Sequence, residues 1–297
     1  MSALSGKLQS GSFAVTTELT PPKGVDLSDL LAKAEALRGY VDGINLTDSP
    51  RARMAITPVV AAKFLLDRGL EPIVQFTTRD RNRIALQADI LGAAALGVGN
   101  AVFMGGDHPS HGDHTDAKAV FDITTIELLQ VARALNEGRD MVGNALKGHP
   151  SMLLGATVNP GARDFEREID NTRRKIDAGA TFLQTQAIYD AGLLRRFVDA
   201  LKPDGVDLLA GIIPLKSSKM GVWLNGNVPG IHVPSALIGE MDRVAGDTEA
   251  EVRLGIEIAA RLVNDVSDCC SGIHLMTMGW ERHIPSILAA SDLPRTH

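Results

Sequence analysis

The stretch SMLLGATVNPGARDFEREIDNTRRKIDAGATFLQTQ, residues 151–186, decides the fold. It begins with a nearly unbroken apolar run at 151–158, continues into apolar residues at helical spacing in 164–180, and ends in a second apolar run at 181–186. Gly179 lies at the end of the helical segment, where glycine often ends a helix because it readily adopts a positive φ. Two strands that are each buried on both faces and are joined by a helix form a parallel βαβ unit. The stretch therefore predicts a parallel sheet covered by helices.

The same alternation runs along the whole chain. Strands are predicted at 13–18, 41–47, 71–77, 100–104, 151–158, 181–186, 206–213 and 272–277. Helical patterns lie between them, for example at 26–37 and 79–97. Eight such repeats in 297 residues are typical of an α/β protein with a single (β/α)8 TIM barrel, so residues 1–297 are expected to form one catalytic domain. A doubly wound open sheet is the alternative, but it would need a glycine-rich GxGxxG turn where the chain has TPPKG.

Charge and cysteine content narrow the class of protein. The net charge is −6, so there is no basic surplus for binding nucleic acid or an anionic membrane surface. Cys269 and Cys270 are adjacent and match neither a disulfide framework nor a metal clip, which favours reduced thiols. The first 15 residues lack the apolar segment of a signal peptide, and the longest near-apolar run, 90–104, is too short to span a bilayer. We expect a cytoplasmic protein.

In a TIM barrel the active site lies at the carboxyl ends of the strands, and three polar residues there stand out. Glu18 precedes a Pro-Pro turn and is either a general acid or a structural carboxylate. Asp107 follows two glycines and either contacts a ligand or forms a local turn. Gln186 ends a strand and either binds the edge of a ring or is a satisfied core amide.

Two further clusters have simpler interpretations. The stretch FMGGDHPSHGDH, residues 103–114, contains three histidines, but their spacing is not that of a zinc site and no cysteine accompanies them. We predict a solvated loop and no metal site. The basic cluster at 173–175 could hold a phosphate, but from the residues alone a solvated helix face is favoured.

The strand ends, taken in order, resemble the methylenetetrahydrofolate reductase family over nearly the whole chain. The resemblance is carried by TTELTPPKG, INLTDS, FTTRDRNR, MGGDHP, ATVNPGA, RRKIDAGATFLQTQ, GIIPL, HVPS and HLMTMGW. It implies a TIM barrel with a non-covalent flavin, FAD or alternatively FMN. It also implies ping-pong hydride transfer from NADH or NADPH through the flavin to 5,10-methylenetetrahydrofolate, which becomes 5-methyltetrahydrofolate.

The resemblance also implies roles for individual residues. Glu18 matches the family acid that protonates N10 as the five-membered ring opens. Asp107 matches an aspartate close to both flavin and folate, and Gln186 matches a glutamine that contacts folate and nicotinamide in turn. The positions that match flavin-binding residues are Thr47, Gly106, Asn171, Arg174 and Lys175.

The chain departs from many bacterial members of the family at four places. Gln75 stands where they have histidine, Gly105 where they have arginine, and Asn159 lies in a turn where they have a Tyr-Pro-Glu type sequence. An aromatic residue of the substrate loop is replaced near Ser218. We assign the first three positions to the cofactor and Ser218 to the substrate.

Three alternatives remain open at the level of sequence. Aromatic residues make up only 4% of the chain, which leaves few stacking partners for a flavin, so a flavin-free reductase that uses NADH directly is the first. The second is a pterin-binding methyltransferase barrel. The third is a non-catalytic subunit that docks on another redox protein. We expect a homo-oligomer, and a redox partner subunit remains open.

Overall fold

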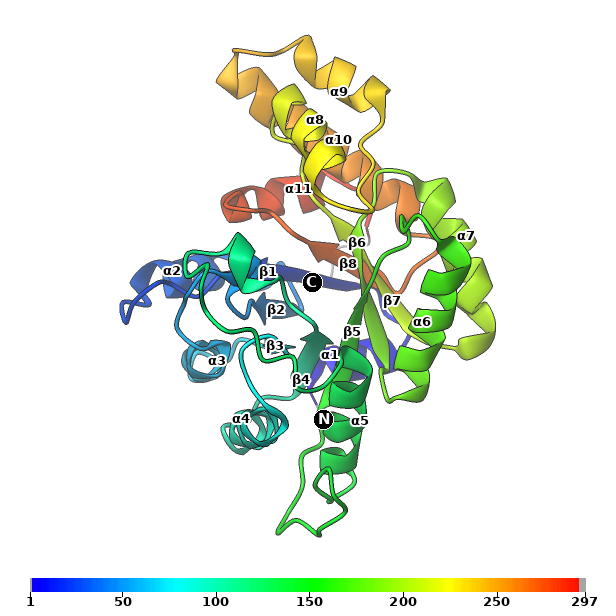
Figure 1. Ribbon diagram of the computed structural model, residues 1–297. Coiled ribbons are helices and arrows are strands. Elements are labelled where there is room, and N and C mark those ends of the chain that lie inside the picture. Colours follow the sequence, from blue (N-terminus) through cyan, green and yellow to red (C-terminus); the bar gives the residue numbers. More distant parts are fainter. Residues whose placement is uncertain (1, 294–297) are drawn as a thin grey trace.

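The computed structural model describes residues 2–293. Eight parallel strands close into a barrel in sequence order (Figure 1). They are β1 (Ala14–Leu19), β2 (Gly43–Leu46), β3 (Pro72–Thr77), β4 (Asn100–Met104), β5 (Leu153–Val158), β6 (Phe182–Ala187), β7 (Asp207–Ile212) and β8 (Gly272–Leu275). The ring is closed by β1 and β8, where Ala14 pairs with Gly272, which excludes the open sheet. All eight predicted strands are confirmed, with bounds within two residues of those expected.

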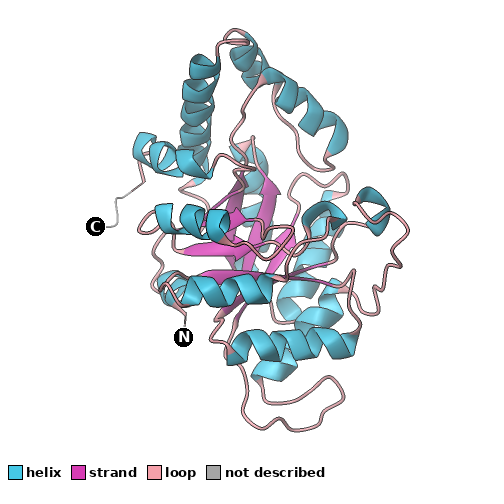
Figure 2. Ribbon diagram, turned by 90° about the vertical axis from the view of Figure 1, so that its left-hand side faces the viewer, coloured by secondary structure: helices cyan, strands magenta, loops and turns pink. Residues whose placement is uncertain are grey.

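Helices surround the barrel (Figure 2). They are α1 (Ala3–Gln9), α2 (Ser28–Ala36), α3 (Pro58–Leu66), α4 (Arg83–Ala95), α5 (Thr125–Asn136), α6 (Phe165–Asp177), α7 (Ala191–Leu201), α8 (Ser218–Asn227), α9 (Ser235–Asp242), α10 (Thr248–Val266) and α11 (Ile284–Ala290). Short 3₁₀ turns are η1 (Pro50–Ala52), η2 (Pro109–His111), η3 (Lys202–Asp204) and η4 (Glu281–His283). The helices α8, α9 and part of α10 project away from the barrel. No helix within residues 2–293 is long and apolar enough to cross a membrane.

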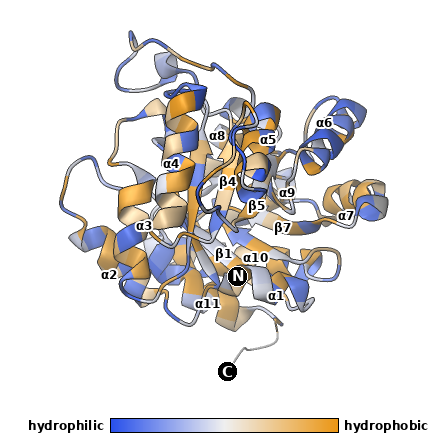
Figure 3. Cartoon of the chain, turned by 90° about the horizontal axis from the view of Figure 1, so that it is seen from below, coloured by the Kyte–Doolittle hydropathy of each residue, from blue (hydrophilic) through white to orange (hydrophobic). Residues whose placement is uncertain are grey.

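The helix α6 shows why the predicted pattern folds as expected. Asp164 caps its first turn by accepting a hydrogen bond from the Arg167 backbone N–H. Gly179, just past its end, has a φ of +122°, as predicted for a residue that terminates a helix. Few of its side chains are buried, and Figure 3 shows the helix as largely hydrophilic. It therefore covers the sheet with a narrow face only.

The lower part of the barrel interior is apolar and closed. Leu4 and Leu8 of α1 pack against side chains that point into the barrel, which are Ala14, Ile73, Val102, Phe182 and Leu209. The ring of Phe182 passes over Gly155, where a Cβ atom would lie 2.3 Å from it. Because α1 covers this end, the interior opens toward the carboxyl ends of the strands.

The capping box of α5 gives a first stability prediction. The Thr124 hydroxyl accepts from the Glu127 N–H at 3.2 Å, and the Glu127 carboxylate accepts from the Thr124 N–H at 2.7 Å. Thr124→Ala should lower the free energy of unfolding by about 1 kcal/mol, because helix N–H groups lose their partner. Equilibrium urea unfolding measures this. Thr115→Ala, in an exposed loop, is the control, and an equal loss there would contradict the capping role.

Candidate active site

A cavity of about 550 Å³ lies at the carboxyl ends of the strands, a size suited to a small-molecule ligand. Most of the residues predicted for the site line it, namely Glu18, Thr47, Gln75, Gly106, Asp107, Asn159, Lys175 and Gln186. A larger hollow of about 700 Å³ lies beside α4 and around residues 146–151, and it contains none of the predicted residues. The position of the strand ends, rather than size, therefore identifies the candidate site.

Glu18 stands at the wall of the cavity beside a buried histidine. Its side chain is 26% exposed, and its Oε2 lies 3.9 Å from Nε2 of His274, which is 4% exposed. The hydroxyl of Thr16 lies 3.0 Å from Nδ1 of His274 and 3.2 Å from the Ile273 carbonyl oxygen. The Ile273 carbonyl can only accept, so the Thr16 hydroxyl donates there, and its role toward Nδ1 depends on the tautomer of the ring.

A polar layer inside the barrel supports this histidine. Asn45 Nδ2 donates to Gln184 Oε1 at 2.7 Å, and Gln184 Nε2 donates to Asn45 Oδ1 at 3.2 Å. Gln184 Nε2 also lies 3.4 Å from His274 Nδ1. Interiors of such barrels usually contain branched apolar side chains, so a polar layer here is unusual. None of these three residues was predicted for the site, although each is a polar residue within an apolar strand.

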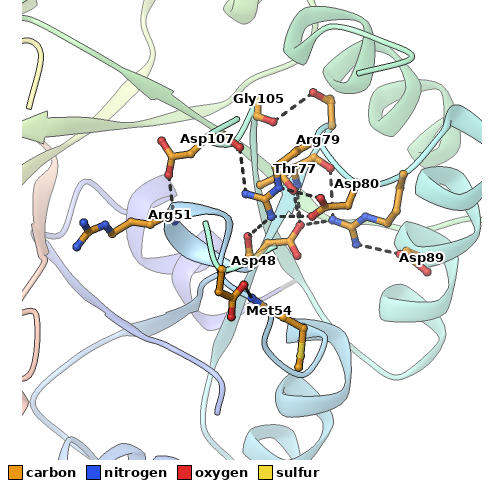
Figure 4. A network of polar contacts seen from close by, with 12 residues as sticks. Asp48, Arg51, Met54, Thr77, Arg79, Asp80, Asp89, Gly105 and Asp107 are labelled. Carbon is orange, nitrogen blue, oxygen red and sulfur yellow. Dashed lines mark hydrogen bonds and ion pairs between the residues drawn. The ribbon is translucent and has the colours of Figure 1, made fainter. Parts of the chain in front are cut away.

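Asp107 is positioned by its neighbours in the fold. Gly106 before it has a φ of +85°, and a Cβ atom there would lie 3.0 Å from Thr77 Cβ, so glycine is required. The Asp107 carboxylate accepts from the Arg51 backbone N–H at 3.0 Å, in the loop after β2 (Figure 4). Its carbonyl oxygen accepts from Arg79 Nη1 at 3.5 Å. The carboxylate thus bonds a neighbouring loop and also borders the cavity.

A buried cluster of charges joins the loops that follow β2 and β3 (Figure 4). Arg79 is only 2% exposed and donates to the Asp80 carboxylate at 2.8 and 2.6 Å. This contact, opposed by burial, raises the pKa of Arg79. The Asp48 carboxylate accepts from both N–H and hydroxyl of Thr77 at 2.9 Å and pairs with Arg81. These contacts fix one wall of the cavity.

The opposite wall carries a buried cation. Lys175 on α6 donates to the Thr157 carbonyl oxygen at 2.7 Å. Burial lowers the pKa of Lys175, and the nearby Glu168 carboxylate acts against that shift. A partly desolvated ammonium group that borders a cavity is well placed to bind an anionic or polar ligand group.

Two amide side chains complete the cavity. At Gln186 the register of β6 with β7 shifts, and its Oε1 accepts from the Ala187 N–H at 2.9 Å. Such an irregularity re-aims the side chain at the end of a strand. The Oδ1 atom of Asn159 is buried and has no hydrogen-bond partner among the described residues. An unpaired buried acceptor is costly, so a donor that reached this oxygen would stabilise the site.

The structure places four of the predicted residues outside the lining of the cavity. Gly105, Asn171, Arg174 and Ser218 do not border it. The hydroxyl of Ser218 instead donates to Asp242 at 3.1 Å, and Arg174 is exposed. Their assigned contacts with cofactor or substrate stay predictions. In residues 2–293, no three His, Cys, Asp or Glu side chains are grouped in a way that could hold a metal ion.

The fold and the cavity together define a (β/α)8-barrel protein with a cavity of small-molecule size at the carboxyl ends of its strands. The family model described as methylenetetrahydrofolate reductase matches residues 3–292, and the chain belongs to that family. The resemblance seen in the sequence is thereby confirmed.

Curated relatives are distant and differ in length. The 5,10-methylenetetrahydrofolate reductase of Pectobacterium carotovorum subsp. carotovorum is 25% identical over 268 residues, which cover 86% of this chain and 82% of that protein. Methylenetetrahydrofolate reductase 2 of Schizosaccharomyces pombe is 23% identical over 97% of this chain and 46% of that protein. Methylenetetrahydrofolate reductase (NADH) 1 of Zea mays is 24% identical over 65% of this chain and 33% of that protein. The chain thus spans half or less of the length of these two eukaryotic relatives.

Solved structures agree on the fold. An uncharacterised protein from Clostridium thermocellum that binds two copies of 5-methyl-5,6,7,8-tetrahydrofolic acid superposes with a TM-score of 0.61. It is 19% identical, and the match covers 97% of this chain and 98% of that one. EDTA monooxygenase from Chelativorans sp. BNC1 superposes with a TM-score of 0.56 at 13% identity, over 96% and 95% of the two chains.

Proposed function

We propose that this protein reduces 5,10-methylenetetrahydrofolate to 5-methyltetrahydrofolate with NADH or NADPH, using a non-covalent flavin. The observation that carries the proposal is the placement of Glu18 against His274 at the wall of a cavity that Asp107 and Gln186 also border. Membership of the reductase family and the folate ligand of the Clostridium thermocellum protein support it.

The residues that border the cavity fit a flavin. Gly106 borders the cavity with its backbone, which a ring can approach. The unpaired Asn159 Oδ1 can accept from a ring N–H, and Lys175 can contact ribityl or phosphate oxygens. Met104 and Met276 offer apolar, adaptable contact surface. A bound flavin would take a hydride from the nicotinamide and supply it to the folate.

Glu18 provides the proton for the folate half-reaction. Its protonated carboxyl donates to N10, the five-membered ring opens, and the resulting 5-iminium cation accepts the hydride. His274 Nε2 lies beside the carboxyl at 3.9 Å, and the buried Thr16 hydroxyl contacts the imidazole at Nδ1. The polar layer below also contacts the imidazole, so the wall beside the acid is ordered before the substrate enters.

Asp107 and Gln186 orient the rings. The fixed negative charge of Asp107 disfavours further negative charge on the ring system beside it, which favours hydride donation. Its second oxygen can accept from a pterin N–H, since the Arg51 N–H occupies only Oδ2. The amide of Gln186 can bind the edge of a pterin or a nicotinamide through donor and acceptor together.

An anaerobic visible spectrum tests the proposal. The purified protein should show flavin absorbance that NADH bleaches and methylenetetrahydrofolate restores. A protein that stays colourless after incubation with both FAD and FMN would contradict the flavin. A flavin that NADH bleaches but the folate does not restore would contradict the assigned substrate.

Direct hydride transfer without flavin is the second candidate. It is favoured by one feature, since the described lining of the cavity includes no Phe, Tyr or Trp side chain to stack on a flavin ring. Colourless protein that still oxidises NADH when methylenetetrahydrofolate is added would establish this candidate instead.

A further inference from the structure

The loop after β2, residues 48–54, has an unusual backbone. Ser49, Arg51 and Ala52 all have a positive φ, at 48°, 57° and 52°. Residues with a Cβ atom rarely adopt this left-handed region, and they do so where surrounding structure imposes it, most often near a functional site. The neighbours of this loop therefore determine its position.

Two carboxylates of the loop after β4 hold it by its main chain. Asp107 accepts from the Arg51 N–H, and Asp113 accepts from the Met54 N–H, both at 3.0 Å. The other oxygen of Asp113 accepts from Lys23 Nζ at 2.6 Å. The Lys23 ammonium and the Met54 N–H lower the pKa of Asp113 to about 2, so it stays charged at neutral pH. Each of these two carboxylates thus already accepts from the main chain of the loop.

The two loops also pack closely. A Cβ atom at Gly112 would lie 1.9 Å from the carbonyl oxygen of Ala52, so only glycine fits there. The 3₁₀ turns η1 and η2 lie against each other at this point. This brings the histidine-containing stretch 103–114 alongside the loop after β2.

The side chains of Arg51 and Arg53 are exposed, and their guanidinium groups make no hydrogen bond or ion pair with the described residues. By contrast, Arg79 and Arg81 in the next loop are both paired with carboxylates. Figure 4 shows the Arg51 side chain extending away from the cluster around Arg79. Pro50 borders the cavity, and Arg51 and Arg53 follow it closely in the chain.

We propose that Arg51 and Arg53 form an anion clamp at the rim of the cavity. The clamp binds the anionic tail of the ligand that occupies the cavity, which is the diphosphate of a dinucleotide or the glutamate carboxylates of a folate. Guanidinium groups match the oxygens of both in geometry and charge. Because the backbone is already fixed, only the two side chains have to be ordered on binding. The choice of ligands rests on the proposed function.

The test compares tailed with truncated ligands. Dissociation constants are measured by fluorescence for NADH and reduced nicotinamide mononucleotide, and for 5-methyltetrahydrofolate with one and with five glutamates and a tetrahydropterin without a tail. The double variant Arg51→Gln/Arg53→Gln should bind a tailed ligand about tenfold more weakly and a truncated one unchanged. In the wild-type protein, the difference in affinity between tailed and truncated ligands should decrease with added salt. In the double variant, this difference should not depend on salt.

Two further variants control for charge and folding. Arg68→Gln removes another exposed arginine, two residues past the end of α3, and should change the affinity for neither kind of ligand. Arg51→Lys/Arg53→Lys keeps the charge and should recover most of the affinity. If the double glutamine variant loses affinity for NADH alone, the clamp binds the diphosphate. If it loses affinity for the folates alone, the clamp binds the glutamate carboxylates.

Other outcomes overturn the clamp. Equal weakening of tailed and truncated ligands would mean that the cavity itself is damaged, and unchanged binding of all ligands would mean that the arginines are bystanders. Failure of the proposed function gives a different result from failure of the clamp alone. In the first case the wild-type protein binds neither folate nor dinucleotide, whereas in the second it binds them and the double variant binds them equally well.

Discussion

Glu18→Gln should slow reduction of methylenetetrahydrofolate by about a hundredfold or more and leave reduction of the flavin by NADH nearly unchanged. The amide keeps the shape of the side chain but has no acidic proton for N10, whereas hydride transfer from the nicotinamide needs none. Stopped-flow absorbance separates the two half-reactions. NADH is mixed with oxidised protein in one, and methylenetetrahydrofolate with reduced protein in the other.

A second carboxylate of the same cavity provides the control. Glu168 accepts from the Asn159 N–H at 2.9 Å and borders the cavity without touching His274. Glu168→Gln should retain most of the folate half-reaction. If Glu18→Gln reduced both half-reactions equally, Glu18 would be a structural residue and the assigned acid role would be wrong.

Asp48→Ala should lower the free energy of unfolding by about 3–5 kcal/mol. Asp48 is 7% exposed, and its carboxylate is the acceptor for the N–H and hydroxyl of Thr77 and the partner of Arg81. Its removal leaves the buried Thr77 N–H without its acceptor and leaves the largely buried Arg81 guanidinium with Asp89 as its remaining carboxylate partner. Equilibrium urea unfolding followed by circular dichroism gives the change in the midpoint and slope.

A surface pair shows what the same deletion costs without burial. Asp67 pairs with Lys63 on the exposed side of α3, and Asp67→Ala should change the free energy of unfolding by about 0.5 kcal/mol or less. Asp48→Asn keeps an acceptor for Thr77 and should recover part of the loss. Equal losses for Asp48→Ala and Asp67→Ala would show that the buried cluster does not stabilise the loops.

The barrel could be predicted because its strands are buried on both faces and therefore appear as continuous apolar runs. Glu18, Asp107 and Gln186 could be singled out because a polar residue at the carboxyl end of such a run faces the mouth of a barrel. The helices at 26–37, 79–97 and 164–180 were expected slightly too long. In 79–97, for example, the first residues form the polar loop around Arg79, and Asn82 caps the helix only after them.

Other features depend on contacts that sequence alone does not specify. His274, Gln184 and Asn45 are each one polar residue in an apolar strand, and only the closed barrel brings them together. The left-handed backbone at Arg51 has no local signal, since no glycine or asparagine marks it. It is imposed by Asp107 from a loop 56 residues away. Long-range contacts of this kind explain why the rim of the site escaped prediction.

Because apolar side chains of α1 close the floor of the barrel, the cavity opens at the carboxyl ends of the strands. The nicotinamide and the folate must therefore enter and leave through the same opening. While one of them is bound, it prevents the other from binding. An excess of either should therefore slow turnover, and NADH should compete with the folate for the reduced protein although the two molecules share little chemistry. Leu4 and Leu8 thus contribute to the order in which the substrates bind, because they close the end of the barrel opposite to Glu18.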